Sequence, residues 1–315
     1  MDISIVIPTY EGIATLKKCL RMLRRQQADD TIFSYEIIVV IDKKDRRTEE
    51  WFSKEGRRYP QLQIIRAQGA GVNSARNKGI EESQGEIIFF LDDDCVPPHK
   101  TWLNEVFSVF CLYPDADVIG GGYRCRERKD ILAISRNKLD AFYVQCNRNS
   151  SGETAVLLGG DCGYRRKIFE KCGAFDETIH YGSAEKEMHD RIRKKGIKML
   201  YCEKLSVFHS TPKKNIIVYF NKSFKQGAGQ GYSTMRNGSL SLPAGCVNQR
   251  FWFIVIAREC EGRLMGKSLT SLFLLGNAFF YHMGKMYGVF KCAIKESLFN
   301  RTLKFIRAGN FLWKS

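Results

Sequence analysis

The stretch Glu86-Ile-Ile-Phe-Phe-Leu-Asp-Asp-Asp-Cys95 places three consecutive aspartates directly after an apolar run. Such a run is typical of a buried strand, and packing alone does not call for a cluster of carboxylates at its end. In open α/β sheets, ligands collect beyond the carboxyl ends of the strands. Strand alternation sends Asp92 and Asp94 to one side and Asp93 to the other. The stretch therefore predicts an Asp-x-Asp pair that binds Mn²⁺ or Mg²⁺ bridged to phosphate oxygens, the alternative being a solvated acidic turn that caps the next helix.

The first 211 residues alternate short apolar runs with helical patterns. Strands are expected at 3–7, 36–41, 62–67, 86–91, 117–121 and 198–202, and residues 155–158 lead into Gly159-Gly-Asp161. Helices are expected at 13–23, 72–83, 99–110, 165–171 and 184–195. Residues 124–150 are mixed and polar, which predicts an irregular excursion. Because β-branched runs alternate with helices, we expect an α/β fold with a doubly wound, mostly parallel sheet, in which the strand ends at Pro8, Asp42 and Asp92 share one edge.

A glycine-rich segment, Gly69-Ala-Gly-Val-Asn-Ser-Ala-Arg-Asn-Lys-Gly79, separates two of these strands and opens a helix. Glycines permit close backbone approach, and a helix N-terminus with a nearby arginine favours an anion. The segment fails as a dinucleotide fingerprint because Ser74 occupies the place of the third glycine. The acidic residue that the fingerprint needs about twenty positions later is the triple aspartate, which would repel a cofactor's phosphates unless a metal intervened. A nicotinamide-dependent oxidoreductase is therefore a remote alternative.

Several motifs occur together in one order: Val6-Ile-Pro-Thr-Tyr10, Val39-Val-Ile-Asp42, Gly71 through Gly79 with Ala75-Arg-Asn77, and Leu91-Asp-Asp-Asp94. Three more follow: Gly160 through Arg166, Gly173-Ala-Phe-Asp-Glu177 and Glu185 through Arg191. Together they resemble the inverting family 2 glycosyltransferases, which have the GT-A fold. The resemblance covers residues 1–211 and implies a GT-A catalytic domain there, with a nucleotide-sugar half at about 1–122 and an acceptor half at about 123–211.

The resemblance implies a metal-dependent glycosyltransferase of the hexosyltransferase type. It would move a sugar from a nucleotide-diphosphate donor to a hydroxyl of a glycan, polysaccharide or lipid-linked saccharide in a single displacement. Donor contacts are expected from Pro8, Thr9, Tyr10, Glu11, Asp42, Gly71, Arg76, Asn77, Asp92 and Asp93. Mn²⁺ or Mg²⁺ is expected at Asp92 and Asp94, and His209 is either a further metal ligand or a structural hydrogen-bonding residue.

The acceptor-side helix departs from the family pattern Glu-Asp-x-Glu-Leu-x-x-Arg. Counting back from Arg191 places Ala184 at the first Glu and Glu185 at the Asp. We expect Glu185 to act as the catalytic base that takes the acceptor's proton, although it and Glu187 could instead be solvated or helix-capping acids. Asp161, where the family often has Asn, is a second candidate base, or it binds acceptor hydroxyls.

Lys43 is a second departure, because it follows Asp42 where the family commonly repeats an aspartate. This lysine leaves the nucleobase open. Together with Ala184, it motivates a nonenzymatic alternative, a catalytically weak nucleotide-sugar-binding module that docks at a membrane.

Net charge, cysteine content and the N-terminal sequence indicate the cellular compartment of the protein. Its net charge is +16, of which +13 falls in residues 212–315. The eleven cysteines include no Cys-x-x-Cys pair, and an odd number cannot all pair within the chain, which favours reduced thiols. The N-terminus goes straight into a strand without the pattern of an export signal. We therefore expect a cytoplasmic protein.

Residues 212–315 set apolar aromatic clusters among lysines and arginines. Ser268 through Gly284 is uncharged for seventeen residues, the short limit for a membrane-spanning helix. The pattern favours a helical extension that lies peripherally on the cytoplasmic membrane face. The alternatives are packing on the catalytic domain or on a second subunit in a homo-oligomer. A nucleic-acid partner is not expected, because no nucleic-acid motif is recognisable and aliphatic runs interrupt the basic residues.

Overall fold

The computed structural model describes residues 1–56, 62–125, 130–179, 184–210, 215–236 and 264–309. The chain divides into two compact units, one made of 1–180 and 184–214 and the other of 181–183 and 215–315. The donor and acceptor halves expected at 1–122 and 123–211 both fall in the first unit, and their roles stay predictions.

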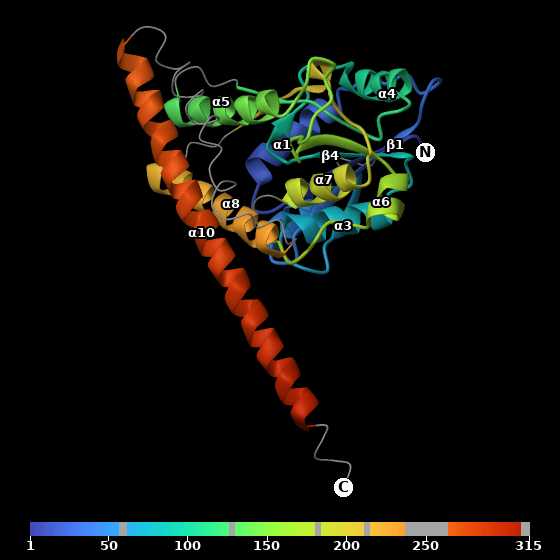
Figure 1. Ribbon diagram of the computed structural model, residues 1–315. Helices are drawn as coiled ribbons and strands as arrows, with labels where there is room; N and C mark the ends of the chain where they lie inside the picture. The colour runs from blue at the N-terminus through green and yellow to red at the C-terminus, as the bar shows by residue number, and fades with distance from the viewer. Residues whose placement is uncertain (57–61, 126–129, 180–183, 211–214, 237–263, 310–315) are drawn as a thin grey trace. The chain divides into compact units, whose positions relative to one another are not determined.

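A seven-stranded sheet forms the centre of the first unit (Figure 1). Its strand order is β3-β2-β1-β4-β8-β6-β9. The strands are β1 (Ile3–Thr9), β2 (Tyr35–Ile41), β3 (Leu62–Arg66), β4 (Ile87–Leu91), β6 (Val118–Gly120), β8 (Asp161–Arg165) and β9 (Met199–Tyr201). All neighbours pair in parallel except β8, which runs antiparallel to both β4 and β6. The expected mostly parallel, doubly wound α/β fold is confirmed.

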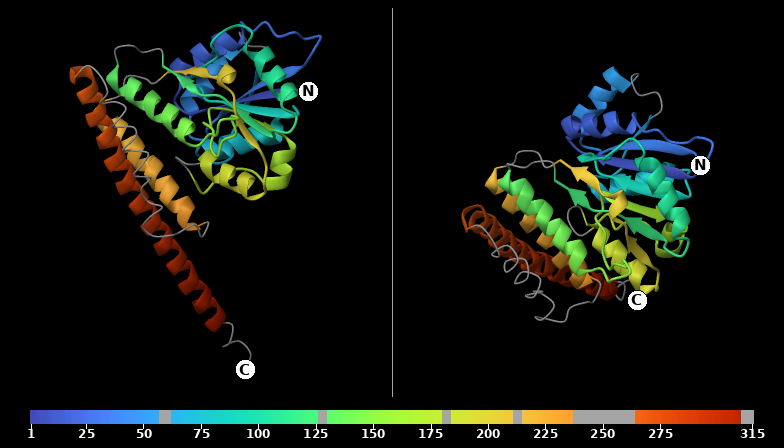
Figure 2. Two further views of the ribbon diagram at one scale, coloured as in Figure 1. Left: turned by 45° about the horizontal axis from the view of Figure 1, so that its top comes forward. Right: turned by 90° about the horizontal axis from the view of Figure 1, so that it is seen from above.

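Helices cover both faces of this sheet, as the two views in Figure 2 also show. The helices on the sheet are α1 (Ile13–Leu23), α2 (Arg46–Glu55), α3 (Val72–Glu82), α4 (Trp102–Leu112), α6 (Lys167–Cys172) and α7 (Ala184–Lys194). The first unit also contains α5 (Ile131–Cys146), which contacts β7 and whose described side chains belong to neither core, and a 3₁₀ turn, η2, at Glu203–Leu205. Alternate strand residues feed two cores. Ile5 and Phe89 pack with Leu16 and Trp102, whereas Val6 and Phe90 pack on the other face with side chains that include Met188. Burial on both faces explains why the strands are continuously apolar.

A small second sheet holds the residues after β4 next to the end of the first unit. It has the order β5-β10-β7, with β5 (Cys95–Val96), β10 (Val207–His209) and β7 (Tyr123–Arg124). In its register His209 pairs with Cys95, which brings the imidazole close to the aspartate run.

The structure corrects two expectations about the middle of the chain. Residues 124–150 are not simply an irregular excursion, because they contain α5, whose start is capped by the Asp130 side chain accepting from the N–H groups of Leu132 and Ala133. No strand was expected between residues 150 and 165, yet Asp161–Arg165 form β8, which joins the sheet three residues after 155–158.

The described part of the second unit consists of two helices, α8 (Ile216–Arg236) and α10 (Leu264–Gly309), which lie alongside each other. Glycines let their backbones approach closely. A Cβ added to Gly227 would lie 1.9 Å from the Tyr281 carbonyl oxygen, and one added to Gly284 would lie 1.9 Å from that of Phe224. The expected helical C-terminal extension is confirmed. Within the described residues, neither helix combines the length and apolar content required to cross a bilayer.

Candidate active site

The turn after β1 is anchored by two carboxylates, Asp93 just after β4 and Asp45 at the start of α2. Thr9 donates its hydroxyl to Asp93 Oδ2 at 2.6 Å, and the Glu11 N–H donates to Asp45 Oδ2 at 2.6 Å. Burial and the neighbouring charge of Asp94 raise the pKa of Asp93 to about 8. Pro8 is buried in the strand, while Tyr10 is 54% exposed at the turn. Asp93 therefore holds the turn that presents Tyr10.

Asp42, at the end of β2, fixes the start of α3. Its Oδ2 accepts from the Gly71 N–H at 2.7 Å and its Oδ1 accepts from the Lys44 N–H at 2.8 Å. Gly71 has φ 96°, a conformation that strains other residues, so its glycine is required by the backbone. The carboxylate is 5% exposed. In this structure the aspartate expected at the nucleoside shapes the glycine-rich segment.

Arg76 places a buried guanidinium at the centre of the site. It stacks over the rings of Phe90 and Phe175 at 5.8 and 5.5 Å and reaches Asp92 Oδ1 with Nη2 at 3.4 Å. Its Nε and Nη1 are buried and have no hydrogen-bond partner among the described residues. Burial opposes its charge, but the negative charges of Asp92 and Glu185 raise the pKa of Arg76 above its ordinary value. Such a cation with unused donors suits an anionic ligand.

Asp94, which follows β4, lies in contact with His209, the last residue of β10. His209 Nε2 lies 3.3 Å from Asp94 Oδ2, and the Ser210 N–H donates to the Asp94 carbonyl oxygen at 2.7 Å. Tyr123 stacks on the imidazole with ring centroids 4.4 Å apart, and its hydroxyl accepts from the Gly160 N–H. Carboxylate and imidazole are donors that Mn²⁺ accepts. The buried His209 Nδ1 has no partner in the described part of the chain.

The predicted metal ligands are therefore close together but are not arranged as a complete cage. In the described ranges, no group of three or more His, Cys, Asp or Glu side chains is placed to hold a metal ion. Asp94 and His209 are adjacent, whereas Asp92 contacts Arg76. The donor set fits a Mn²⁺ or Mg²⁺ ion whose remaining ligands come from phosphate oxygens and water.

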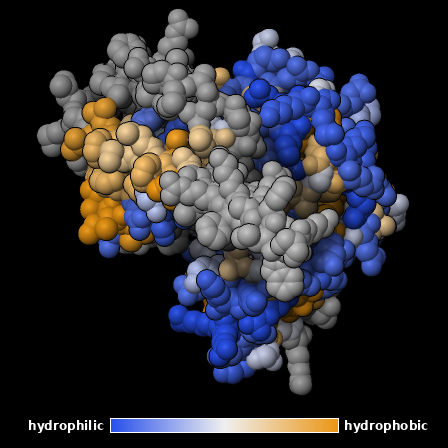
Figure 3. Space-filling view, turned by 60° about the horizontal axis from the view of Figure 1, so that its bottom comes forward, coloured by the Kyte–Doolittle hydropathy of each residue, from blue (hydrophilic) through white to orange (hydrophobic). Residues whose placement is uncertain are grey.

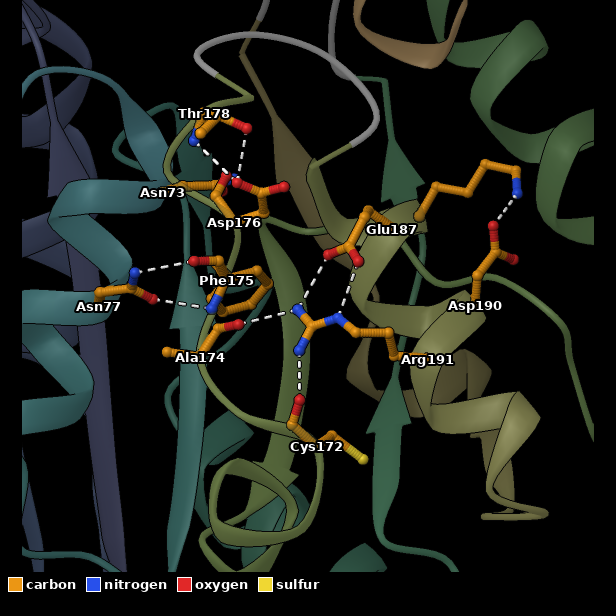
Figure 4. Close-up of polar contacts among 11 residues, drawn as sticks. Asn73, Asn77, Cys172, Ala174, Phe175, Asp176, Thr178, Glu187, Asp190 and Arg191 are labelled. Atoms are coloured by element: carbon orange, nitrogen blue, oxygen red, sulfur yellow. Dashed lines mark hydrogen bonds and ion pairs between the residues drawn. The ribbon is translucent and has the colours of Figure 1, made fainter. Parts of the chain in front are cut away.

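Asn73 and Asn77 of α3 hold the loop that follows α6 (Figure 4). Asn73 donates to the carbonyl oxygens of Asp176 and Ile179 at 2.7 and 3.2 Å. Asn77 accepts from the Phe175 N–H and donates to the Phe175 carbonyl oxygen, both at 2.9 Å. The polar atoms of Asn77 thus face this loop, although the resemblance implied a donor ligand.

Helix α7 holds the same loop from the other side. Arg191 donates to Glu187 through Nε at 2.8 Å and Nη2 at 2.9 Å, and to the Ala174 carbonyl oxygen through Nη2 at 2.8 Å. Its Nη1 donates to the Cys172 carbonyl oxygen (Figure 4). Glu187 is 6% exposed, so it is a buried partner of Arg191 and not a solvated acid.

The two candidate bases lie in different environments. Glu185, in the first turn of α7, is partly exposed and close enough to Arg76 to influence its pKa. Asp161 is 0% exposed. Its Oδ2 is packed so closely against Gly121 that a Cβ on that glycine would lie only 2.5 Å from it. Burial raises the pKa of Asp161 well above its ordinary value. An acceptor hydroxyl can approach Glu185 more readily than Asp161.

Sequence reasoning placed the charged residues but missed their supports. Phe175 and Tyr123 contact the predicted site residues Arg76 and His209, and Glu187 pairs with Arg191, which holds the loop after α6; none of the three was predicted to have such a role. Glu187 and Arg191, four apart on one helix, were the detectable signal for an ion pair. No local pattern could have indicated that Phe175 stacks on Arg76, because the two residues are ninety-nine positions apart.

The fold and the site define the class of the protein: a GT-A glycosyltransferase that uses a nucleotide-sugar donor. Residues 4–173 match the family model described as "Glycosyl transferase family 2", and the chain belongs to that family. This membership sets the nicotinamide alternative aside.

Relatives agree with this assignment. Glycosyltransferase AglE of Haloferax volcanii is 27% identical over 231 residues, 72% of each chain. Uncharacterized glycosyltransferase YwdF of Bacillus subtilis is 31% identical over 186 residues, 57% of this chain and 64% of its own. Among solved structures, the mannosyltransferase PcManGT from Pyrobaculum calidifontis, in complex with GDP-Man and Mn²⁺, is 14% identical, has a TM-score of 0.58 and aligns over 93% of this chain and 86% of its own. At that identity the likeness concerns the fold.

Proposed function

We propose that this protein is an inverting, metal-dependent hexosyltransferase that transfers a sugar from a nucleotide-diphosphate donor to a hydroxyl of a glycan, polysaccharide or lipid-linked saccharide. The observation that carries the proposal is the position of Arg76 between Asp92, at the end of β4, and Glu185, at the start of α7. Arg76 thus lies between the edge of the sheet where we expect the donor to bind and the helix, α7, where we expect the acceptor to bind.

In the proposed reaction Glu185 accepts the proton of the acceptor hydroxyl. The acceptor oxygen forms a bond to the anomeric carbon from the face opposite the diphosphate, while the bond from that carbon to the phosphate oxygen breaks. The nucleoside diphosphate leaves with the electron pair, and the anomeric configuration inverts. The buried Arg76 guanidinium, with two unused donors, would stabilise the negative charge that develops on the leaving group.

Asp94 and His209, with Asp92 nearby, would hold the metal ion. Bound there, Mn²⁺ or Mg²⁺ would neutralise charge on the diphosphate. The GDP-Man and Mn²⁺ bound by PcManGT on the same fold support a donor and a metal of these classes. The proposed cytoplasmic setting is supported by the cysteine content, an odd number without any Cys-x-x-Cys pair.

Asp161 is better suited to a structural role than to proton transfer. Its complete burial raises the pKa of the carboxyl and disfavours the charged carboxylate that a general base needs, and it also keeps an acceptor hydroxyl from reaching the group. Glu185 is therefore the base in our proposal.

The test has a binding arm and a turnover arm. Calorimetry with a panel of nucleoside diphosphates and their sugars, with and without Mn²⁺, should identify one nucleotide class whose binding needs the metal and is lost in Asp94→Asn. Hydrolysis of that donor sugar, with water as acceptor, should then fall at least about a hundredfold in Glu185→Gln. Asp190→Asn, a carboxylate-to-amide change on the same helix, should keep nearly full activity. The anomeric configuration of the released sugar, read by NMR, tests inversion.

Each arm can contradict a different part of the proposal. Metal-dependent donor binding without any turnover would favour the catalytically weak binding module. Absence of nucleotide binding under every condition would refute the transferase proposal itself. Equal turnover in Glu185→Gln and the unchanged protein would remove Glu185 as the base.

A further inference from the structure

The outward face of α10 is apolar where a helix in water would be polar. Between residues 272 and 294, nine of the ten exposed residues are large apolar or aromatic side chains, and the tenth is Lys291. Leu272, Phe279, Met283, Met286, Phe290 and Ile294 are spaced so that they share one side of the helix. We call the exposed side chains of 272–294 the outer face of α10. Figure 3 shows apolar surface over the helix pair.

The side of α10 that packs on α8 has the opposite character. It carries glycines at the closest approach, with Gly284 facing the Phe224 carbonyl oxygen and Gly288 facing that of Ala228. Polar groups also lie between the helices: Ser223 donates to Asn277 Oδ1, and Tyr281 donates to Gln230 Oε1 at 2.5 Å. The contact between the helices is therefore close and partly polar, with aromatic pairs such as Phe220–Phe280 beside the glycines.

This arrangement reverses the pattern of helices in water, which bury their large apolar residues and expose polar ones. Helices in lipid pack through small residues and polar pairs, and turn large apolar side chains outward. An exposed apolar face of this extent marks a surface that contacts something other than water. The reversed pattern points to lipid.

The net charge of this region favours anionic lipid as its partner and disfavours association with a second copy of the chain. Residues 212–315 carry a net charge of +13, and neither 216–236 nor 264–295 contains Asp or Glu. Two copies of this region would repel each other through its net charge, whereas an anionic bilayer would attract it. Because neither described helix meets the requirements for a span, the contact lies along the bilayer surface.

We infer that the outer face of α10 is a docking surface for an anionic lipid bilayer, with its aromatic and methionine side chains inserted at the headgroup boundary. The inference rests on the helix pair and not on the transfer reaction, so either can fail without the other.

Flotation of the full-length protein with vesicles tests this surface. Vesicles of phosphatidylglycerol mixed with phosphatidylcholine should capture the protein, and vesicles of phosphatidylcholine alone should capture less. The double change Phe279→Ser with Phe290→Ser should weaken capture about tenfold or more, because two aromatic side chains leave the lipid. Leu112→Ser is the matched control, because Leu112 is 68% exposed and Phe290 65%, and Leu112 lies on α4 of the first unit. It should leave capture unchanged.

Lys291→Glu provides a second variant on the same face that removes no apolar contact. It should weaken binding to the anionic vesicles about tenfold and leave binding to phosphatidylcholine unchanged. Light scattering of each variant detects a second copy bound at the outer face of α10. Thermal unfolding of each variant detects packing of that face against the rest of the chain. Unchanged capture by every variant, a halved mass in the phenylalanine variant, or a loss of thermal stability without loss of capture would overturn the inference. The last two outcomes would assign the face to a second copy or to the chain itself.

Discussion

Asn77 binds the backbone of Phe175 at both of its polar groups, accepting from the N–H and donating to the carbonyl oxygen at 2.9 Å each. This pairing fixes the ring of Phe175, which stacks on the Arg76 guanidinium at 5.5 Å. A residue of α3 thereby holds the loop that follows α6, and this loop supports the buried Arg76 guanidinium next to Asp92.

Asn77→Ala should loosen Phe175 from Arg76. We expect the free energy of unfolding to fall by about 2 kcal/mol, because the Phe175 N–H and carbonyl lose their partner. Donor hydrolysis should slow about tenfold, with the donor KM nearly unchanged. Urea unfolding and steady-state kinetics measure the two effects. Lys78→Ala, which breaks only surface ion pairs of the same helix, should change either quantity little. A raised donor KM with unchanged stability would instead favour Asn77 as a direct donor ligand.

Arg191→Lys should weaken the second hold on this loop. A lysine cannot reproduce the two-pronged contact with Glu187 while also binding the carbonyl oxygens of Cys172 and Ala174. We expect a loss of about 1–3 kcal/mol in unfolding free energy, because the buried Glu187 charge loses donors. Arg193→Lys is the matched control on the same helix, since Arg193 is exposed and its ion pair with Asp190 is 3.9 Å long. Equal losses in both variants would contradict a specific role for Arg191.

The sheet could be predicted because the strand signal is local. Each buried parallel strand is a continuous apolar run, so the sequence alone locates β1, β2 and β4 within one or two residues. Strand β8 was missed because Asp161–Arg165 joins the sheet despite its polar residues, whereas the nearby apolar residues Val156, Leu157 and Leu158 are buried without joining it. Helix α5 was missed because its apolar residues are interspersed with polar ones, and only the Asp130 cap marked its start.

The candidate site was predictable in its residue types and not in its contacts. Clustered carboxylates after β4 indicated a charged edge, because the chemistry of such a cluster is local. Which carboxylate faces which partner depends on pairs distant in sequence, such as Asp42 with Gly71 and Thr9 with Asp93. A one-dimensional pattern does not carry that information.

His189 should make the protein acid-sensitive. It is 0% exposed, and its Nδ1 accepts from the Leu157 N–H at 3.4 Å, which leaves Nε2 to donate to the Tyr164 hydroxyl at 2.8 Å. Burial lowers the pKa of His189 to about 3, below the usual 6.5. The unfolded chain therefore takes up the proton first as pH falls. The stabilising effect is complete above pH 6.5 and is lost toward pH 3, at up to about 1.4 kcal/mol per pH unit.

Urea unfolding of the unchanged protein and His189→Gln at several pH values from 7 to 4 measures this contribution. The variant should be less stable at pH 7, and the difference in unfolding free energy between the two proteins should shrink as pH falls. A difference that stays constant across this range would mean that His189 does not titrate between the folded and unfolded states.

Gly284→Ala should destabilise the helix pair although alanine is the better helix former. In an exposed helix interior the change would stabilise by about 1 kcal/mol. Here the added Cβ would lie 1.9 Å from the Phe224 carbonyl oxygen, so α8 and α10 must separate. We expect a net loss of about 2 kcal/mol, measured as faster amide hydrogen exchange in 216–236 and 272–294. Gly56→Ala is the control, because its Cβ would meet Ile64 Cδ1 at an ordinary 3.7 Å and its φ is −60°. Unchanged exchange in Gly284→Ala would show that the close glycine contact is not needed to hold the two helices together.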